Sequence, residues 1–440
     1  MRQTVSRLLP VGSFARSVGV LTGGTIGARA ILALSLPLVT RLYSPTDFEL
    51  LAIYMAVLSL VTVIASLRLN MAITLPAEDG EAANLLALSL LAAAVFGIVL
   101  SVPVIFVPDL VAGVIGQPGM LPLLWMIPLG ILLAAAYQAL QYWASRKRRF
   151  GLVARTRVAR AVGGAGTQLG LGFAGIAPFG LLLGHMIYSG LGIVGLVRDL
   201  LRNDRGALAA VSPGAMWRAL VAYRRFPIWS VPEALANSAG MQVPVIVIAA
   251  IALGPEAGYL ALAMQVMAMP MALVGQSVAQ VFIAEAPARL RDGTLTAFTR
   301  RTALTLFALG AAVLVPLGLL APYVFGPIFG AEWARAGEIV LWMTPWHILQ
   351  FTASPVSTVL HVTGHLRVAM ALQFIGAALR IGAVALAGAL AAGWISEVYA
   401  LSGAVFYGIY IGVVYVIAVR STMDGRGQDK IHSTNVTGKK

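Results

Sequence analysis

Cysteine is absent from this chain of 440 residues, and charged residues are scarce. Without cysteine the chain can form no disulfide, no thiolate metal site and no thiol nucleophile. Charged residues make up 11% of the sequence, whereas soluble globular domains contain about 25%. Acidic residues are the scarcer kind, because 17 Asp and Glu stand against 31 Lys and Arg. These absences exclude an ordinary soluble domain and any chemistry that depends on a cysteine sulfur.

Apolar residues are abundant and make up 59% of the chain. Apolar runs of about 20 residues recur over its whole length, and a helix of about 20 residues crosses a bilayer core. A transmembrane β-barrel would instead show short segments of alternating polarity. We therefore predict an all-α polytopic membrane protein. We expect about twelve transmembrane helices, near residues 18–39, 48–66, 84–107, 121–143, 157–175, 178–197, 227–252, 257–282, 303–325, 336–360, 368–391 and 396–419.

The positions of the basic residues predict how the chain is threaded through the membrane. If the amino terminus is cytoplasmic, about 26 of the 31 Lys and Arg lie in the tails and connections on that side. The opposite side then holds only Arg41 and Arg335. The net charge of +14 therefore reflects topology, and it predicts no nucleic-acid partner. We expect both termini in the cytoplasm and an uncleaved first span, because no small-x-small cleavage site follows the basic start.

A long connection and a weak internal repeat predict two halves. The connection 198–226 follows the sixth predicted span, and it contains an amphipathic segment typical of a helix on the inner membrane surface. SPTDFELLAIYMAV joins the first two predicted spans, and it is similar to GPEAGYLALAMQV, which joins the seventh and eighth. We therefore predict two pseudo-symmetric six-helix lobes, 1–197 and 227–420, around a central cleft, with 198–226 as the linker. The polar segment 421–440 is predicted to be a disordered cytoplasmic tail.

Polar residues inside eight of the predicted spans fall on one helical face, at spacings of three or four residues. A single polar stripe of this kind can also be a packing seam between helices. The similar arrangement of stripes in both halves favours a shared polar cavity. The amide side chains that we predict to bind a substrate there are Gln138, Gln141, Gln168, Asn237, Gln276, Gln280 and Gln373.

Three arginines lie inside predicted spans, at Arg29, Arg160 and Arg380. A guanidinium in the middle of a bilayer costs roughly 2.5–3.5 kcal/mol on insertion scales, so we expect each to face a polar cavity or a partner. Arg160 is near enough to the cytoplasmic end of its span to reach the interface instead. Glu233 is the one clear acid within the spans, and it could pair with one of these arginines. The excess of guanidinium groups, which hold phosphate oxygens bidentately, predicts an anionic ligand.

Glu233, His185 and His347 are the candidates for ion coupling, because these groups can carry a proton within a membrane. Each histidine could equally be a hydrogen-bonded packing residue, and they are too dispersed in the sequence to indicate a metal site. The glycines of LTGGTIGAR lie within a predicted span and lack the lysine of a phosphate-binding loop. We therefore predict no catalytic residue, no metal and no cofactor, and a driving force that comes from a gradient or a partner.

Two long segments resemble one family of membrane proteins. RLYSPTDFELLAIYMAVLSLVTVIASLRLNMAITLPAEDGEAANLLALSLL resembles the first helical hairpin of the bacterial oligosaccharide flippases, within the multidrug/oligosaccharidyl-lipid/polysaccharide (MOP) exporter superfamily. RRFPIWSVPEALANSAGMQVPVIVIAAIALGPEAGYLALAMQVMAMPMALVGQSVAQVFIAEA is similar to the seventh and eighth helices of that family. Glu49 departs from the family pattern, which usually has glycine there, and this puts the local turn geometry in question.

The resemblance implies a transporter that moves an undecaprenyl-pyrophosphate-linked oligosaccharide from the cytoplasmic to the outer leaflet of the bacterial inner membrane. It implies alternating access and a role in the biosynthesis of a surface polysaccharide, such as the O-antigen of lipopolysaccharide or an exopolysaccharide. Arg29, Arg380 and Arg160 would hold the pyrophosphate or acidic sugars, and the glutamines would bind the glycan. The implied partners are the lipid-linked oligosaccharide, membrane lipids, a polysaccharide polymerase and other assembly proteins.

Two other functions remain open at this point. An ion-coupled multidrug exporter of the same superfamily would need buried acids to bind cations, and Glu233 is the one available. A membrane-embedded polysaccharide polymerase or ligase would also use arginines. Such enzymes generally have a substantial extracytoplasmic loop, whereas the predicted outer connections here are short. The flippase is therefore the preferred interpretation, and the protein is predicted not to be an enzyme.

Overall fold

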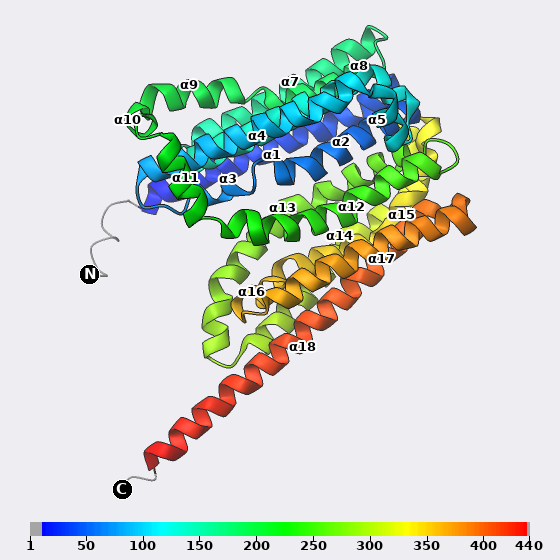
Figure 1. Ribbon diagram of the computed structural model, residues 1–440. Helices are drawn as coiled ribbons and strands as arrows, with labels where there is room; N and C mark the ends of the chain where they lie inside the picture. The colour runs from blue at the N-terminus through cyan, green and yellow to red at the C-terminus, as the bar shows by residue number, and fades with distance from the viewer. Residues whose placement is uncertain (1–10, 438–440) are drawn as a thin grey trace. The chain divides into compact units, whose positions relative to one another are not determined.

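A computed structural model describes the backbone of residues 11–437, and the side chains of residues 11–18, 271–281, 283–284 and 423–437 are not described. The described residues are almost entirely helical, and no strand occurs among them (Figure 1). The chain forms two compact units, residues 1–238 and 239–440. The helices of the first unit are α1 (Val11–Leu42), α2 (Pro45–Ala65), α3 (Leu69–Ala72), α4 (Asp79–Phe106), α5 (Pro108–Ile115), α6 (Met126–Arg146), α7 (Phe150–Phe173), α8 (Phe179–Gly190), α9 (Ile193–Asn203), α10 (Arg205–Ala209) and α11 (Pro213–Ala222), with a 3-10 helix at Pro118–Leu123.

A π-helical turn at Phe226–Ser230 leads into α12 (Val231–Ile251), within which the first unit ends and the second begins. The second unit continues with α13 (Glu256–Arg291), α14 (Leu295–Phe329), α15 (Ala334–Val356), α16 (Thr358–Val362), α17 (Leu366–Leu390) and α18 (Ile395–Thr437), with 3-10 helices at Ala331–Trp333 and Ala392–Trp394. Helix α18 thus runs through most of the segment 421–440 that was predicted to be a disordered tail. Residues 438–440 lie outside the described residues.

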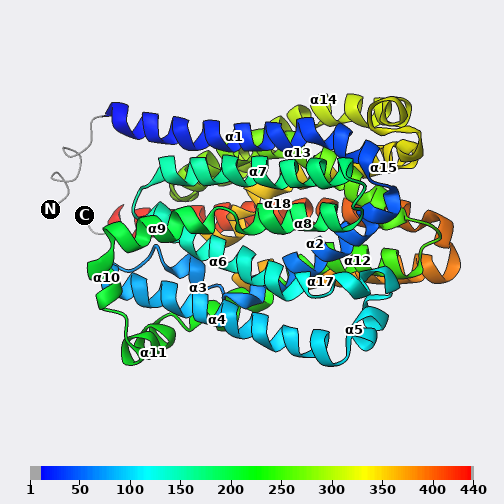
Figure 2. The same cartoon turned by 90° about the horizontal axis from the view of Figure 1, so that it is seen from above.

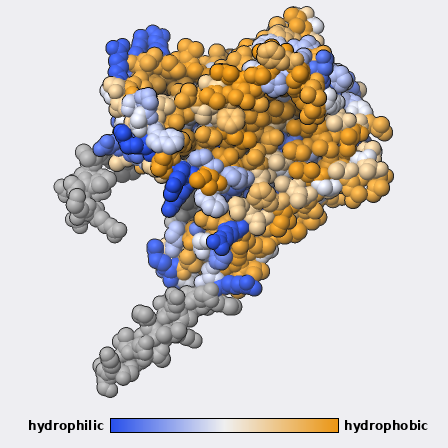
Figure 3. Space-filling view, viewed as in Figure 1, coloured by the Kyte–Doolittle hydropathy of each residue, from blue (hydrophilic) through white to orange (hydrophobic). Residues whose placement is uncertain are grey.

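Eight helical segments of the described chain are long and apolar enough to cross a membrane. The remaining four predicted spans coincide with α6, α7, α13 and α15, each of at least 21 residues. Apolar side chains dominate the face drawn in Figure 3. Ile98 and Ile105 on α4, for example, are each 67% exposed, which is the expected state of residues that contact lipid. The prediction of an all-α, multi-pass membrane protein is confirmed.

Helix α2 illustrates how the local sequence defines an element. Pro45 occupies the first turn, where its missing N–H is not needed, and Ser44 caps the helix. The Ser44 hydroxyl accepts from the Asp47 N–H, and the Asp47 carboxylate accepts from the Ser44 N–H, which makes a capping box. Glu49, the departure from the family pattern, lies inside the helix rather than in a turn. It is buried and accepts a hydrogen bond from Gln117 at 2.7 Å.

In the first unit, α1 lies along α7, and α6 packs against both α4 and α8 (Figure 2). Gly24 permits the close approach of α1 to α7, since a Cβ there would lie 2.6 Å from that of Ala154. Trp143 and Leu140 of α6 form a buried cluster with Leu86 of α4. The predicted linker also belongs to this unit, because α10 and α11 pack on α4.

The boundary between the two units therefore differs from the predicted linker 198–226. The side chain of Asn84 on α4 donates to the carbonyl of Ala210 at 3.1 Å and accepts from the N–H of Ser212 at 3.2 Å. Ala219 of α11 is buried in the cluster formed by α4 and α6. These hydrogen bonds and contacts hold the segment on the first unit, and the boundary falls between Ser238 and Ala239. The exposed Trp217 is 66% accessible, consistent with the predicted interfacial face of α11.

The second unit is built on α14, α15 and α18, which pack along one another. Small residues allow the close contacts, because a Cβ at Gly318 would meet the Thr344 hydroxyl at 2.1 Å, and one at Gly337 would meet the Ala321 carbonyl at 2.4 Å. A second buried cluster joins Val356, Leu360 and Phe406 to Phe282 of α13.

Candidate functional site

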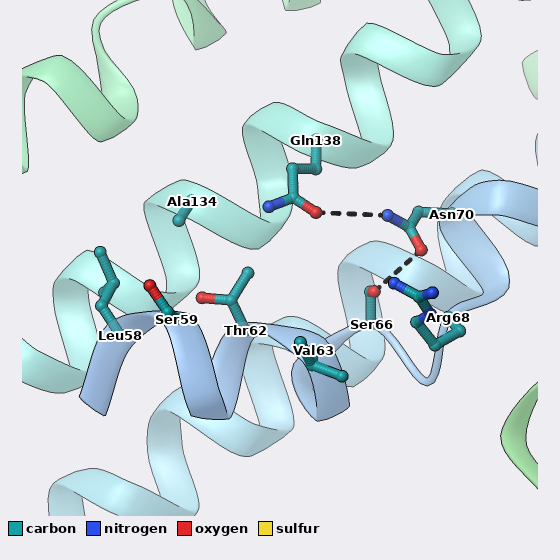
Figure 4. Close-up of a pocket in the computed structure, with 9 residues that line it drawn as sticks. All are labelled: Leu58, Ser59, Thr62, Val63, Ser66, Arg68, Asn70, Ala134 and Gln138. Carbon is teal, nitrogen blue, oxygen red and sulfur yellow. Dashed lines mark hydrogen bonds between the residues drawn. The ribbon is translucent and has the colours of Figure 1, made fainter. Parts of the chain in front are cut away.

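A polar cavity of about 300 Å³ opens in the first unit between α2, the α2–α3 turn and α6. Figure 4 shows Leu58 and Ser59 at one end of it, and Arg68 and Asn70 at the other. Six of its nine lining residues carry polar side chains, and none of the nine is acidic. The lining residues are Leu58, Ser59, Thr62, Val63, Ser66, Arg68, Asn70, Ala134 and Gln138.

The sequence of α2 explains why these hydroxyls meet. Ser59, Thr62 and Ser66 are spaced three and four residues apart, so they lie on one helical face. The helix then breaks, because Leu67 and Arg68 adopt positive φ angles of 51° and 57°. The left-handed conformation costs roughly 1–2 kcal/mol for a residue that has a Cβ. This strained turn redirects the chain into α3 and places Arg68 at the end of the hydroxyl stripe.

The hydrogen bonds of the cavity leave donors free. The Ser66 hydroxyl donates to the Asn70 side-chain oxygen at 3.1 Å, and the Asn70 amide donates to the Gln138 oxygen at 3.5 Å. The Thr62 hydroxyl and the Arg68 Nε are buried without a hydrogen-bond partner in the described part of the chain. Buried polar groups are normally paired, so these two atoms are available to a ligand. A single guanidinium among hydroxyls and amides suits a hydroxyl-rich ligand that carries an anionic group.

Gln138 is the predicted binding residue that the structure places in this cavity. Gln141 lies one turn along α6 and is half-buried, outside the lining. Gln168 instead connects α7 to α8, because its amide donates to the Leu181 carbonyl at 3.2 Å. The Tyr43 hydroxyl in turn donates to the Gln168 backbone carbonyl at 2.8 Å.

Arg29 is half-buried on α1 and has no hydrogen-bonded or ion-paired partner among the described residues. One turn before it on the same helix, Thr25 accepts a hydrogen bond from the Arg157 guanidinium of α7 at 2.6 Å. Arg157 was not among the predicted site residues. Two guanidinium groups therefore lie at neighbouring levels of the α1–α7 pair.

Arg160, by contrast, is held by its own unit. Its guanidinium carbon lies 3.7 Å from the centre of the Tyr137 ring and 4.4 Å from that of Tyr188. Its Nε also donates to the Tyr188 backbone carbonyl. His185 completes this aromatic group, with its ring 5.8 Å from the rings of Tyr54 and Tyr188. The residues Arg160 and His185 thus join α6, α7 and α8 and do not line the cavity.

Arg380 of the second unit is enclosed by aromatic rings. Its guanidinium carbon lies 4.5 Å from the Phe406 ring, 5.3 Å from Tyr407 and 5.6 Å from Trp346. One Nη donates to the Gly240 carbonyl at 3.3 Å, whereas the Nε is buried without a partner in the described chain. The residue is only 2% exposed, so a ligand has no access to it in this structure.

The other predicted residues are more scattered. His347 is buried, and its Nδ1 lies 3.0 Å from the Met343 carbonyl. Asn237 is exposed, and Glu233 and Gln373 are half-buried. The side chains of Gln276 and Gln280 lie outside the described residues. The structure brings none of these described residues together with the cavity of the first unit.

An ion-pair cluster around the buried Asp204 carboxylate lies where α6, α7 and α9 of the first unit meet. Both Nη atoms of Arg149 donate to the Asp204 carboxylate, at 2.7 and 2.8 Å, and the Trp143 indole donates to it at 2.8 Å. Burial opposes ionisation of Asp204, but these hydrogen bonds and the charges of Arg149 and Lys147 hold its pKa below the ordinary value. The cluster binds the start of α7 to the end of α9.

The second unit has an equivalent cluster built on one arginine. Arg335 contacts Glu256 at 3.0 Å, Glu338 at 2.9 Å and Glu397 at 2.7 Å. Although burial opposes its charge, the hydrogen bonds to Glu256 and Glu338 raise the pKa of Arg335 above its ordinary value. The cluster ties together the first turns of α13, α15 and α18.

The cavity also contains residues that sequence reasoning missed. Arg68 follows the predicted span 48–66 and was therefore interpreted as one of the basic residues that determine the topology, not as a binding residue. A signal was present for Asn70, which continues the stripe of Ser59, Thr62 and Ser66 at a spacing of four residues, whereas Arg68, two residues after Ser66, falls off that face. The helix break that turns them into the cavity left no sequence signal, since neither Leu67 nor Arg68 is a residue that favours positive φ.

Comparisons with known proteins place the chain in a family. The family model described as "Polysaccharide biosynthesis protein" matches residues 38–338. A search of curated proteins gives no match. Among solved structures, the eukaryotic MATE transporter AtDTX14 is similar, with 14% identity, a TM-score of 0.58 and coverage of 94% of this chain and 99% of that one.

A variant of the Vibrio cholerae MATE transporter VcmN is similar at 12% identity and a TM-score of 0.58, over 93% of this chain and 98% of that chain. An inward-facing multidrug resistance MATE transporter of the MOP superfamily follows at 16% identity and a TM-score of 0.54, over 94% and 95%. At these identities the likeness establishes the fold, which in MATE transporters has twelve transmembrane helices in two lobes. The chain therefore has the MATE fold, and it belongs to the family of polysaccharide biosynthesis proteins.

Proposed function

We propose that this protein exports an undecaprenyl-pyrophosphate-linked oligosaccharide from the cytoplasmic to the outer leaflet of the bacterial inner membrane. The transport serves the biosynthesis of a surface polysaccharide, of which O-antigen and exopolysaccharide are the two candidates. The transport proceeds by alternating access, and both termini lie in the cytoplasm. The family match and the MATE fold support a transporter, and the polar cavity of the first unit supports a glycan as its cargo.

The cavity carries this proposal. Sugar hydroxyls both donate and accept hydrogen bonds, and the hydroxyl and amide side chains of Ser59, Asn70 and Gln138 match them on both counts. A pocket for an apolar drug would be lined mainly by aliphatic and aromatic side chains. Of the nine lining residues, three are aliphatic and none is aromatic.

The diphosphate of the carrier lipid needs cations outside this cavity. Arg29 has no partner among the described residues, and Arg157 reaches the neighbouring turn of α1. Two guanidinium groups at neighbouring levels can bind the oxygens of a diphosphate. We therefore assign the diphosphate to Arg29 and Arg157, whereas Arg380 and Arg160 are occupied by aromatic rings.

Reconstitution into vesicles tests the proposal. A fluorescent, lipid-linked oligosaccharide is placed in both leaflets, and a membrane-impermeant lectin or glycosidase measures how much reaches the outer leaflet. The protein should speed this transfer well above that in empty vesicles, and the double variant Arg29→Gln, Arg157→Gln should lose most of the gain. Transfer at the rate of empty vesicles by the folded wild-type protein would refute the proposal.

Multidrug export is the second candidate, because similar solved structures include multidrug resistance transporters. A cationic dye would have to enter a cavity that contains Arg68 and lacks an acidic side chain. Efflux of cationic dyes from cells that express the protein would favour this second function. We expect no efflux above that of cells carrying an empty vector.

A further inference from the structure

A second cavity, of about 330 Å³, lies in the second unit between the start of α14 and one face of α18. Five of the eight described residues that line it carry polar side chains, and none of the eight is acidic. None of the residues predicted to bind substrate or to couple an ion is among them. The lining residues are Gly293, Thr294, Thr296, Ala297, Arg300, Tyr415, Val419 and Thr422.

The spacing of these residues explains why they meet. Thr296 and Arg300 are four residues apart on α14, and Tyr415, Val419 and Thr422 are spaced four and three apart on α18, so each set lies on one helical face. The Thr296 hydroxyl donates to the Ala418 carbonyl at 2.9 Å and lies 2.9 Å from the Thr422 hydroxyl. These hydrogen bonds join α14 to α18 beside the cavity.

The charge of the cavity favours an anion. Arg300 is exposed and has no hydrogen-bonded or ion-paired partner among the described residues. The first turn of α14 adds partial positive charge, because no side chain caps it. Of the acids close in sequence, Asp292 is exposed and outside the described lining, and Glu285 is ion-paired with Arg289 at 3.1 Å.

The position of the cavity relative to the membrane indicates the kind of anion. Leu304 and Phe307 follow Arg300 at spacings of four and seven residues on the same face of α14, within a segment apolar enough to span a membrane. They are 63% and 46% exposed, as expected of side chains that contact acyl chains. In the predicted topology, Arg300 lies at the cytoplasmic end of this face. An anion at Arg300 would therefore lie at the level of the lipid headgroups.

From this arrangement we propose that the cavity between α14 and α18 binds the phosphate of an anionic phospholipid, such as phosphatidylglycerol, from the cytoplasmic leaflet. The Arg300 guanidinium binds the phosphate oxygens, and the Tyr415 and Thr294 hydroxyls donate to the phosphate or to the headgroup glycerol. The acyl chains lie along Leu304 and Phe307. The site is independent of the cargo, and its lipid stabilises the contact between α14 and α18.

Lipid titration of the purified, full-length protein in detergent tests this site. The probes are phosphatidylglycerol and phosphatidylcholine with the same acyl chains, and native mass spectrometry of the delipidated protein measures their affinities. We expect the wild type to prefer phosphatidylglycerol. Arg300→Gln should weaken its binding by about tenfold, the value of a hydrogen bond to a charged group, and leave phosphatidylcholine within about twofold. Arg300→Lys should retain part of the preference.

The matched control is Arg301→Gln, which removes the same charge from the next residue of α14. Arg301 is exposed and lies outside the cavity lining, so its variant should bind both lipids like the wild type. Ala297→Leu is a second test that keeps every charge. Its larger side chain occupies the cavity, and it should weaken phosphatidylglycerol even if Arg300→Gln does not fold.

Three results would overturn the site. They are equal affinity of the wild type for the two lipids, unchanged binding of phosphatidylglycerol by both Arg300→Gln and Ala297→Leu, and an equal loss in Arg300→Gln and Arg301→Gln, which would indicate diffuse surface charge. Inorganic phosphate is the remaining probe. If it bound as tightly as phosphatidylglycerol and displaced it, the cavity would be a site for free phosphate and the lipid assignment would be wrong.

Discussion

Arg68 and Arg380 are both buried at Nε without a hydrogen-bond partner in the described chain, and yet their surroundings are opposite. Arg68 borders an open cavity among hydroxyls and amides. Arg380 is 2% exposed and lies against the rings of Phe406, Tyr407 and Trp346. An arginine side chain is thus accessible to a ligand in the first unit, whereas the arginine of the second unit is buried in the core.

The difference shows that depth in the membrane does not by itself make an arginine a binding residue. Aromatic faces stabilise a buried guanidinium through their quadrupoles, so Arg380 has no need of an anionic ligand. Among the residues whose side chains the structure describes, no aromatic ring stacks on Arg68 and no acid is ion-paired with it. What surrounds the guanidinium, rather than where it lies in a span, separates the two roles.

The largest expected effect is on stability, when Arg380 is removed from the aromatic cage formed by Phe406, Tyr407 and Trp346. Arg380→Ala removes a large buried side chain, and we expect it to lower the free energy of unfolding by about 4 kcal/mol. Arg380→Met, which keeps most of the volume, should lose far less. Denaturant unfolding in detergent, followed by tryptophan fluorescence, measures both. If Arg380→Ala were as stable as the wild type, Arg380 would not stabilise the fold, and the proposed difference between Arg380 and Arg68 would be contradicted.

A smaller loss in the free energy of unfolding is expected when Asp204 is replaced. Its partner Arg149 is ion-paired, unlike Arg68. Asp204→Asn removes the buried carboxylate that accepts from both Nη atoms of the half-buried Arg149 and leaves Asp199 as the remaining counter-charge; this should cost about 3 kcal/mol. The pKa of Asp204 lies below its ordinary value in the folded state, so its carboxylate stabilises the fold above about pH 4. That contribution is lost as the pH falls through the folded-state pKa.

Melting temperatures measured from pH 6 to pH 3 check the Asp204 prediction. The wild type should lose more stability than Asp204→Asn as the pH falls, because the variant has no carboxylate to protonate at this position. Asp109→Asn, which removes an exposed carboxylate on α5, serves as a control outside the cluster. Parallel pH profiles of wild type and Asp204→Asn would contradict the assignment.

Arg160 tests whether aromatic contacts also hold an arginine of the first unit. Replacing Arg160 with Met removes its cation–π contacts with Tyr137 and Tyr188, and we expect a loss of about 2 kcal/mol in stability. Thermal unfolding of the purified variant measures this loss. A variant as stable as the wild type would contradict this structural role of Arg160, and Arg160 would then resemble Arg68 rather than Arg380.

The smallest effect separates two glutamines of one helix. Gln138→Ala should lower the rate of vesicle transfer of the lipid-linked oligosaccharide by about fivefold, the value of one lost hydrogen bond. Gln141→Ala, one turn away and outside the cavity lining, should change it by less than about twofold. Vesicle transfer assays of the two variants measure the difference, and an equal loss in both would contradict the placement of Gln138, and not Gln141, in the cavity lining.

The sequence was sufficient for the fold class because apolar runs and charge asymmetry are strong signals in membrane proteins. It also predicted Gln138, which lines the cavity. It could not place Arg160 and Arg380 against aromatic rings, because those rings belong to other helices, 23 to 34 positions away in the sequence. Arg68 was not predicted because the helix breaks at Leu67 and Arg68 without a glycine, the residue that usually occupies positions of positive φ.

The absence of native cysteine permits a direct measurement of the central claim, that Arg68 and not Arg380 is offered to the ligand. Single-cysteine variants Arg68→Cys, Ser59→Cys and Arg380→Cys are purified as folded proteins and exposed to a hydrophilic maleimide. We predict that Cys at positions 68 and 59 reacts readily, that the lipid-linked oligosaccharide slows the reaction at position 59, and that Cys at position 380 stays unreacted. Rapid labelling at position 380, or protection by the glycan there and not at position 59, would contradict the account.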